Sequence, residues 1–257
     1  MSGRLIVDVH AHVGRTITSD IGQTVDEEIA RMASSGIAQS ILSVAAGGVQ
    51  VNGIADTRRA NDEVAAAVAA HPELFPAGLA SVEVRHGQAG LVEVDRAFDE
   101  LGLKGLAFHA TFEGFSVDSA AFDAVLAATN GRRGLVLLHS TPDAKASPAK
   151  IAEVALRYPA LEFIMGHPLF SDTQKEQAVE AVETAPNVHI DIAYQADPAT
   201  TEFFVREAGA DRVFFGSDAP FFPPEDVIAS VDAANIDDAA RTAVLSGNAQ
   251  RLIASLA

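Results

Sequence analysis

The sequence predicts an α/β fold, a (β/α)8 TIM barrel that forms one domain over residues 1–257. Apolar segments of strand length recur eight times along the chain, and segments with helical periodicity lie between them. The apolar segments are continuous rather than alternating, as expected for parallel strands that are buried on both faces. A chain of 257 residues also has the usual length of such a barrel.

The expected elements follow one another in the order that a barrel requires. The strands are predicted at residues 5–9, 40–44, 77–81, 105–108, 135–138, 161–165, 188–192 and 213–215. The helices are predicted at residues 24–35, 56–70, 87–101, 117–128, 147–157, 175–184 and 198–208, with the last ones within 224–256. Thr24 and Glu27 have the spacing of a capping box, and Gly36 is placed to end the first helix. A doubly wound open sheet is the main alternative, but no Gly-x-Gly-x-x-Gly motif follows the first strand.

The amino-acid composition disfavours several classes of binding partner. The formal net charge is −17 and Lys and Arg form no run, which disfavours nucleic acids and anionic membranes as partners. The chain has no cysteine, so any metal ligands must be His, Asp or Glu. No signal-peptide pattern opens the sequence, and no apolar stretch approaches the ~20 residues of a membrane span. We expect a cytoplasmic protein with a small-molecule substrate, and the sequence leaves open whether it forms a homo-oligomer.

A His-x-His motif comes directly after the first apolar segment. Side chains alternate along a strand, so His10 and His12 share one face about 6.6 Å apart. Three later segments also end in a potential metal ligand, namely His139, His167 and Asp218. Each of these alone could be a hydrogen-bonded core histidine or a turn-capping aspartate. Because barrel strands end at a common rim where active sites lie, the set as a whole indicates a metal site.

Several of these motifs, taken in order, resemble a known family. The motifs are Asp8-Val9-His10-Ala11-His12, the strand ends at His139 and His167, Gly216-Ser217-Asp218-Ala219-Pro220, and Gly247-Asn248-Ala249-Gln250-Arg251-Leu252. This pattern is similar to the amidohydrolase superfamily, specifically its amidohydrolase-2 branch. The resemblance extends from residue 8 to residue 252.

The resemblance implies one divalent metal ion, commonly zinc, with manganese as the alternative. Its ligands would be His10, His12, His139 and Asp218, and the catalytic residues would be His167, as an acid or base, and Asp218. Binuclear members of the superfamily carry a carboxylated lysine on the fourth strand. Here Lys104 stands at the beginning of that strand, about 16 Å from the rim, so we expect a single metal.

Residues in the loops at the rim are candidates for substrate binding. His109 and Phe112 follow the fourth predicted strand, Phe170 follows the sixth, and Phe221 follows the eighth. Together they would form a partly aromatic pocket around the metal, although phenylalanines in such loops also serve simply to close a barrel. Arg15, after the first strand, could pair with a substrate carboxylate.

The sequence favours a metal-dependent hydrolase in which activated water attacks an amide, lactone or ester of a small organic acid. The first alternative is a metal-dependent non-oxidative decarboxylase, because the same branch contains such enzymes. Its substrate would be a small carboxylic acid, which could be aromatic. A non-catalytic barrel that binds a metal or another ligand is a further alternative. A three-metal barrel of the histidinol-phosphatase type would need additional His and Glu ligands at strand ends, and the sequence offers no matching set.

Overall fold

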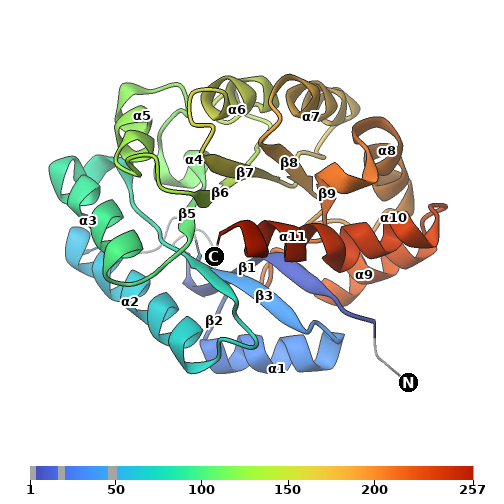
Figure 1. Ribbon diagram of the computed structural model, residues 1–257, viewed down its shortest axis with the longest axis horizontal. Coiled ribbons are helices and arrows are strands. Elements are labelled where there is room, and N and C mark those ends of the chain that lie inside the picture. The colour runs from blue at the N-terminus through green and yellow to red at the C-terminus, as the bar shows by residue number, and fades with distance from the viewer. Residues whose placement is uncertain (1–3, 17–20, 46–50, 257) are drawn as a thin grey trace.

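The computed structural model describes residues 4–16, 21–45 and 51–256. Within these ranges, eight parallel strands lie at the centre and helices surround them (Figure 1). The strands are β1 (Val7–Arg15), β3 (Gln39–Val44), β4 (Ala77–Leu79), β5 (Gly105–Phe108), β6 (Gly134–His139), β7 (Leu161–Gly166), β8 (Val188–Asp191) and β9 (Val213–Phe214). Each overlaps an apolar segment expected to be a strand, so the predicted fold class is confirmed.

The strands form two hydrogen-bonded sheets that meet at two seams. One sheet has the order β2-β1-β3-β4, and the other has the order β5-β6-β7-β8-β9. Ala80 bridges Leu106 in parallel at one seam, and Ala11 bridges Ala219 in parallel at the other. The second seam is reinforced by a hydrogen bond of 2.8 Å from the N–H of His12 to the carbonyl of Ala219. The carboxyl ends of the eight strands therefore face one rim, where barrel enzymes carry their sites.

The first strand is longer than the sequence predicted. It continues to Arg15 because a short strand, β2 (Gly22–Gln23), pairs with its end in antiparallel orientation. The pairing of β1 with β3 also shifts in register between Asp8 and Ala11. Such a shift interrupts the strict alternation of side chains. It lets His10 point toward the rim site although its neighbour Val9 belongs to the apolar interior.

The helices pack around the outside of the strands. They are α1 (Val25–Ser35), α2 (Ile54–Ala70), α3 (Gln88–Asp99), α4 (Ala110–Glu113), α5 (Ala120–Ala127), α6 (Pro148–Ala155), α7 (Asp172–Thr184), α8 (Pro198–Ala208), α9 (Pro224–Ala233), α10 (Asp238–Thr242) and α11 (Asn248–Ser255). Short turns of 3₁₀ helix occur at Val84–His86 and Ala210–Arg212, and a π-helical turn occurs at Ala243–Gly247. The described residues contain no helix with both the length and the apolar character needed to span a membrane.

The first helix shows how closely the local sequence fixes an element. The Thr24 side chain accepts the N–H of Glu27, whose carboxylate accepts the N–H of Thr24, so the predicted capping box is present. Gly36 follows the helix with φ of 75°, a left-handed conformation that glycine adopts without steric cost.

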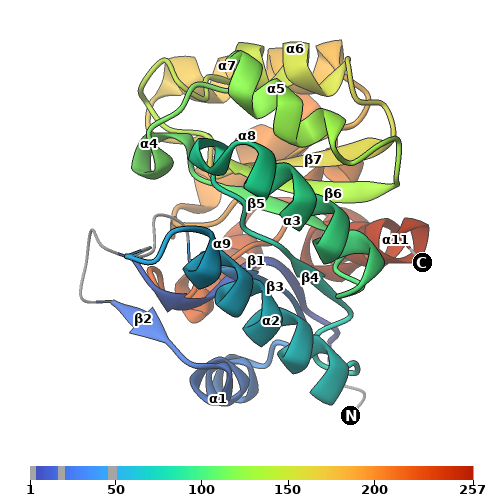
Figure 2. The ribbon, with the colours of Figure 1, turned by 90° about the vertical axis from the view of Figure 1, so that its left-hand side faces the viewer.

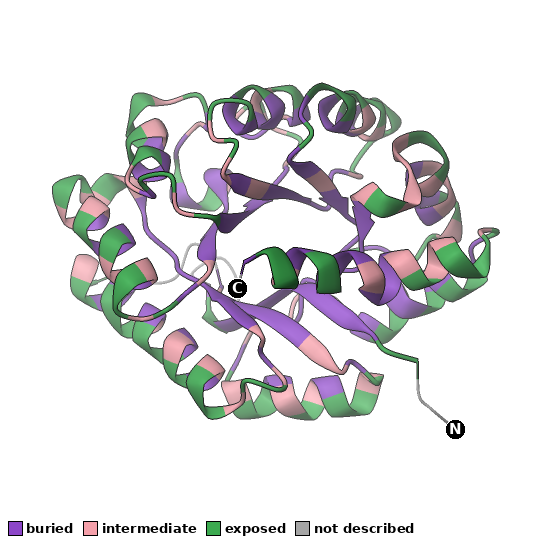
Figure 3. Cartoon of the chain, viewed as in Figure 1, coloured by how far each residue is buried: buried purple, intermediate pink, exposed green. Residues whose placement is uncertain are grey.

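Two apolar clusters hold the barrel together. The larger one lies between the helices and the strands, and the buried faces of both can be followed in Figure 3. The smaller one fills the interior of the barrel, where Val7, Ile41 and Leu137 pack with Leu252 of α11. Figure 2 shows α11 at one end of the strands, with β2 and α4 at the other. The interior is thus closed at the amino ends, and the carboxyl ends are left for a site.

Candidate metal centre

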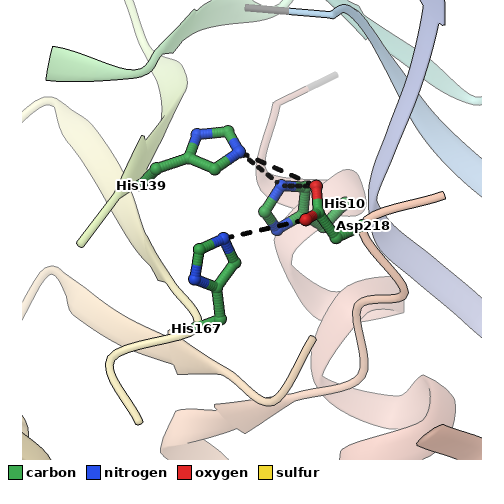
Figure 4. Close-up of side chains that lie close together, drawn as sticks. All are labelled: His10, His139, His167 and Asp218. Atoms are coloured by element: carbon green, nitrogen blue, oxygen red, sulfur yellow. Dashed lines mark hydrogen bonds and ion pairs between the residues drawn. The ribbon is translucent and has the colours of Figure 1, made fainter. Parts of the chain in front are cut away.

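Five buried polar side chains meet at the carboxyl ends of the strands. His10 and His12 come from β1, His139 ends β6, His167 follows β7 directly, and Asp218 lies in the loop after β9. None of these residues exposes more than 5% of its surface. Figure 4 shows His10, His139 and His167 pointing toward the carboxylate of Asp218. The structure therefore brings together every metal ligand and catalytic residue that the sequence analysis named.

The donor atoms of the site are spaced like ligands of one ion. Nε2 of His10 lies 2.9 Å from Nε2 of His12 and 2.9 Å from Nε2 of His139. Oδ1 of Asp218 lies 3.2 Å from Nε2 of His10 and 3.1 Å from Nε2 of His12. Ligand atoms that bind one ion at about 2.1 Å are about 3.0–3.4 Å apart. Nε2 of His139 and Nε2 of His167 each lie 3.8 Å from an oxygen of Asp218. His139 also has its contact of 2.9 Å with Nε2 of His10, whereas the rings of His167 and His10 stack at a centroid distance of 5.7 Å.

Hydrogen bonds on the far side of three imidazoles fix which nitrogen carries the proton. Nδ1 of His10 faces Oδ2 of Asp191 at 2.7 Å, and Nδ1 of His139 faces the carbonyl of Phe108 at 2.9 Å. Nδ1 of His12 lies 2.7 Å from Oγ of Ser43, whose own proton goes to the carbonyl of Ala11. Each Nδ1 must therefore donate, which leaves a lone pair on each Nε2 of the neutral rings.

The Nε2 lone pairs cannot form hydrogen bonds with one another, because all of them are acceptors. Three nitrogen lone pairs that face one another at 2.9 Å repel, and a proton on Nε2 of His10 could satisfy only one neighbour. Oδ1 of Asp218 is also buried without a hydrogen-bond partner. An orphaned buried carboxylate oxygen is costly unless a cation accompanies it. The set of three nitrogens and one oxygen thus fits a divalent metal ion.

Burial and the nearby carboxylates set the protonation states of the metal-free site. Burial disfavours a charged His10, but the carboxylates of Asp191 and Asp218 outweigh it and raise the pKa of His10 to about 10. Burial lowers the pKa of both His12 and His167 to about 4, so these rings are neutral at physiological pH. Burial opposes ionisation of Asp218, yet the charge on His10 and the adjacent imidazoles hold the pKa of that carboxyl well below its usual range.

Asp191 is the residue of the site that the sequence analysis missed. It ends β8 and is fully buried. Besides contacting Nδ1 of His10, it accepts the N–H of His167 at 2.8 Å and that of Ala193 at 3.1 Å. A signal was available, because Asp191 is a carboxylate near the end of the strand predicted at residues 188–192, and the carboxyl end of a barrel strand faces the rim.

Asp8 also supports the site. It accepts the backbone N–H of His10 at 2.9 Å, and both the N–H and the hydroxyl of Ser217, at 3.0 and 2.5 Å. Asp8 therefore ties β1 to the loop that carries Asp218. Burial raises the pKa of Asp8 to about 6.

The backbone is strained at two of the five site residues. His167 and Asp218 have φ angles of 38° and 64°, in the left-handed region that residues with a Cβ rarely adopt. Each such conformation costs about 1–3 kcal/mol and persists only where the surroundings enforce it. The N–H of His167 is held by Asp191, and the N–H of Asp218 is held by the carbonyl of His10 at 2.8 Å.

Gly216 permits the close approach of β1 and the loop after β9. A Cβ added at Gly216 would lie 2.8 Å from the Cβ of His10, closer than real Cβ contacts come. The glycine of the Gly216-Ser217-Asp218 turn is therefore needed for His10 and Asp218 to face one another.

A pocket of about 650 Å³ opens above the five residues. His12, His139, His167 and Asp218 contribute to its lining. The aromatic rings that line it are those of Phe112, Phe170, Tyr194 and Phe221. Volume and aromatic lining are both typical of a site for a small organic molecule.

The residues predicted to bind substrate divide into two groups. His109, Phe112, Phe170 and Phe221 line the pocket, whereas Arg15 is exposed and lies outside its lining. Arg15 ends β1, where it pairs with Gly22 of β2, an element that the sequence analysis did not anticipate.

His109 presents a hydrogen-bond donor to the pocket. Its ring stacks on that of Phe112 at a centroid distance of 3.7 Å, and its Nδ1 accepts the N–H of Phe112 at 3.2 Å. Burial lowers the pKa of His109 to about 2, so the ring is neutral. The proton of the neutral ring must then reside on Nε2.

The position of Lys104 agrees with the expectation of a single metal. Lys104 precedes β5, and its backbone N–H bonds to the carbonyl of Gly78, at the amino end of the barrel strands. It is not among the residues that line the pocket.

The sequence matches the model of the amidohydrolase family over residues 7–254, and the chain belongs to this family. The resemblance noted in the sequence is thereby confirmed. No match to the sequence was found among curated proteins.

Several solved structures share the fold over nearly the whole chain. The 5-carboxyvanillate decarboxylase of Sphingomonas paucimobilis has 19% identity and a TM-score of 0.76, over 98% of this chain and 99% of that one. A 2,6-dihydroxybenzoate decarboxylase in complex with 2,6-dihydroxybenzoate has 21% identity and a TM-score of 0.74, over 99% and 100%. The dihydroxybenzoic acid decarboxylase of Polaromonas sp. JS666, with bound manganese and the inhibitor 2-nitroresorcinol, has 21% identity and a TM-score of 0.72, over 98% and 97%. At these identities the likeness establishes the fold.

Proposed function

We propose that this chain is a metal-dependent, non-oxidative decarboxylase of a small aromatic carboxylic acid. The sequence alone favoured hydrolysis and kept decarboxylation as the alternative. The observation that carries the proposal is the aromatic pocket of about 650 Å³ that opens onto the His and Asp cluster. The known activities of the structurally similar decarboxylases support the same choice.

The proposed metal site holds one divalent ion through His10, His12, His139 and Asp218. Bound there, the ion would act as a Lewis acid toward a carboxylate or hydroxyl oxygen of the substrate. Manganese accompanies the similar decarboxylase of Polaromonas sp. JS666, and it stands beside zinc as a candidate for this chain. Both metals accept nitrogen and oxygen ligands.

The aromatic side chains are proposed to hold the ring of the substrate. Phe112, Phe170, Tyr194 and Phe221 line the pocket, and Phe112, Phe170 and Tyr194 remain partly exposed before a ligand arrives. An aromatic acid would cover these rings and exclude water from the cluster below. The donor on Nε2 of His109 would bond an oxygen of the substrate.

The chemical step needs a proton at carbon. The bond between the ring and the carboxylate breaks, carbon dioxide leaves, and the electron pair stays on the ring carbon, which then takes up a proton. His167 and Asp218 are the proposed source, because Nε2 of His167 lies 3.8 Å from Oδ2 of Asp218 and both residues line the pocket. A proton taken up on Nε2 of His167 would be stabilised by the nearby Asp218 carboxylate and transferred from His167 to the carbon.

Product analysis in oxygen-18 water tests the proposal. The protein is loaded with manganese or zinc and offered 2,6-dihydroxybenzoate and 5-carboxyvanillate, and an amide, a lactone and an ester of matched aromatic acids. We expect stoichiometric carbon dioxide from a carboxylic acid and an organic product without the label. A labelled product carboxylate with no carbon dioxide would instead establish hydrolysis.

A further inference from the structure

A second polar group lines the pocket, and the proposed reaction does not use it. It consists of Thr111, Thr141 and Asp143, which we call the Thr-Asp wall. Thr111 belongs to α4, directly beyond β5, and the other two residues lie in the loop after β6. All three are half-buried. The wall therefore faces any ligand that fills the pocket.

The hydroxyl protons of the two threonines form hydrogen bonds within the Thr-Asp wall. Oγ1 of Thr111 lies 2.6 Å from Oδ2 of Asp143, and Oγ1 of Thr141 lies 3.0 Å from Oδ1 of the same carboxylate. The two hydroxyl oxygens are 2.8 Å apart. Each hydroxyl has a single proton, so two of these three contacts can be hydrogen bonds at one time, and in each such arrangement both protons point to Asp143 or to the other threonine. The two hydroxyl oxygens can therefore offer only lone pairs to a ligand in the pocket.

Asp143 stays ionised and so keeps the threonines in this orientation. Burial opposes its ionisation, but the Thr111 hydroxyl and the backbone N–H and ammonium of Lys145 lower the pKa of Asp143 to about 2. Among the described residues that line the pocket there is no Lys or Arg. A ligand that approaches the wall meets acceptor oxygens and a carboxylate whose ammonium partner, Lys145, lies outside the pocket lining.

We propose that the Thr-Asp wall selects substrates whose ring carries a hydrogen-bond donor, a hydroxyl or amino group, and rejects those with a second carboxylate at that place. This inference rests on the proposed function, because it takes the reacting carboxylate to lie at the histidine cluster. A hydroxyl or amino group donates to a threonine oxygen and so replaces the water that it loses. A second carboxylate brings only acceptors and loses its hydration without compensation.

Binding of matched benzoates to the metal-loaded protein tests the wall by titration calorimetry. The ligands are 3- and 4-hydroxybenzoate, the corresponding methoxybenzoates, and isophthalate and terephthalate, which place a second carboxylate at the same positions. At one position at least, the hydroxyl compound should bind on the order of tenfold more tightly than its methoxy and carboxy counterparts. Equal affinities within each set would overturn the proposal.

Two variants and a control assign any preference to the wall. Thr111→Val with Thr141→Val removes both acceptors and should abolish the preference for hydroxyl over methoxy. Asp143→Asn puts an amide NH₂ opposite one threonine, which frees that hydroxyl proton for the pocket, so it should reduce the discrimination against the dicarboxylates. Asp118→Asn is the control, because Asp118 also holds a hydroxyl and a lysine but lies outside the pocket lining. A preference that survives in the double valine variant would contradict the proposal.

The outcomes separate this inference from the proposed function. Carbon dioxide release without a preference for hydroxyl groups would retain the decarboxylase and reject the wall. A preference for hydroxyl groups that depends on the wall, without carbon dioxide from any acid, would retain the wall and reject the decarboxylase. Failure of every benzoate to bind would reject both.

Discussion

Oδ2 of Asp191 lies 2.7 Å from Nδ1 of His10, and the other oxygen of the same carboxylate accepts the N–H of His167. Asp191 thereby sets the orientation of a proposed metal ligand and the backbone position of a proposed acid. One side chain therefore positions both histidines. Asp191 itself is not one of the proposed metal ligands or catalytic residues. A carboxylate in this position also makes the Nε2 of the imidazole a stronger ligand.

Replacing Asp191 should therefore weaken metal binding. In Asp191→Asn the amide can turn its NH₂ toward Nδ1 of His10, which favours the tautomer with the proton on Nε2, where the metal must bind. We expect a loss of about 10- to 100-fold in metal affinity, measured by competition with a chelator. Asp172→Asn is a matched control at the exposed start of α7. Equal affinities for Asp191→Asn and the wild type would contradict the role given to Asp191.

His167 should be needed for turnover more than for metal binding. Nε2 of His10 lies 2.9 Å from Nε2 of His12 and of His139, whereas the ring of His167 stacks on that of His10 at a centroid distance of 5.7 Å. We expect His167→Asn to keep its metal and to lose on the order of a hundredfold or more in rate. Metal analysis and kinetics on the same preparation check this. Loss of the ion in His167→Asn would make His167 a ligand.

Metal binding should release a proton in neutral solution. The pKa of His10 is raised to about 10 in the metal-free site, so His10 is protonated at pH 7 and must lose that proton to bind the ion. Affinity should fall about tenfold for each pH unit below 10, and more steeply near pH 4, where His12 also becomes protonated. Calorimetry in buffers of different ionisation enthalpy counts the protons. A metal affinity that stays constant between pH 6 and 9 would refute this prediction.

Glu113 should make the protein less stable as the pH rises. Burial raises its pKa to about 8, its Oε1 accepts the N–H of His109, and its Oε2 has no hydrogen-bond partner. The folded state thus binds a proton that the unfolded chain has already released, so the stability from this group is complete at low pH and is lost between about pH 4.5 and 8.

The Glu113→Gln variant tests this dependence, because glutamine does not ionise. Relative to the wild type, its Tm should be higher at pH 9 than at pH 5, by an amount that corresponds to about 1 kcal/mol or more. Glu180→Gln, at an exposed position of α7, should show no such difference. The same offset at both pH values would show that Glu113 is ionised throughout.

The sequence predicted the strands and most of the site because both depend on local patterns. Continuous apolar segments mark strands that are buried on both faces, and a polar residue at the end of such a segment must lie at the rim. This reasoning located His139, His167 and Asp218 without knowledge of any contact. The His-x-His spacing likewise identified the pair on β1.

The remaining features depend on contacts between distant parts of the chain. Asp191 is 181 residues from His10 in sequence, and only the packing of the two sheets against one another brings them together. Arg15 was predicted to contact a substrate, but it pairs with β2 and is not among the residues that line the pocket. The Thr-Asp wall depends on two loops that meet only after folding, and Thr111 and Asp143 carry no local pattern that sets them apart.

Elemental analysis of the purified protein tests the central claim most directly, namely that three imidazole lone pairs and the orphaned oxygen of Asp218 hold one divalent ion. Protein purified without added metal should contain about one ion per chain, and a variant with His10→Ala and His12→Ala should contain none while it remains folded. Two or three ions per chain at full occupancy, or an unchanged metal content in the double variant, would contradict the account.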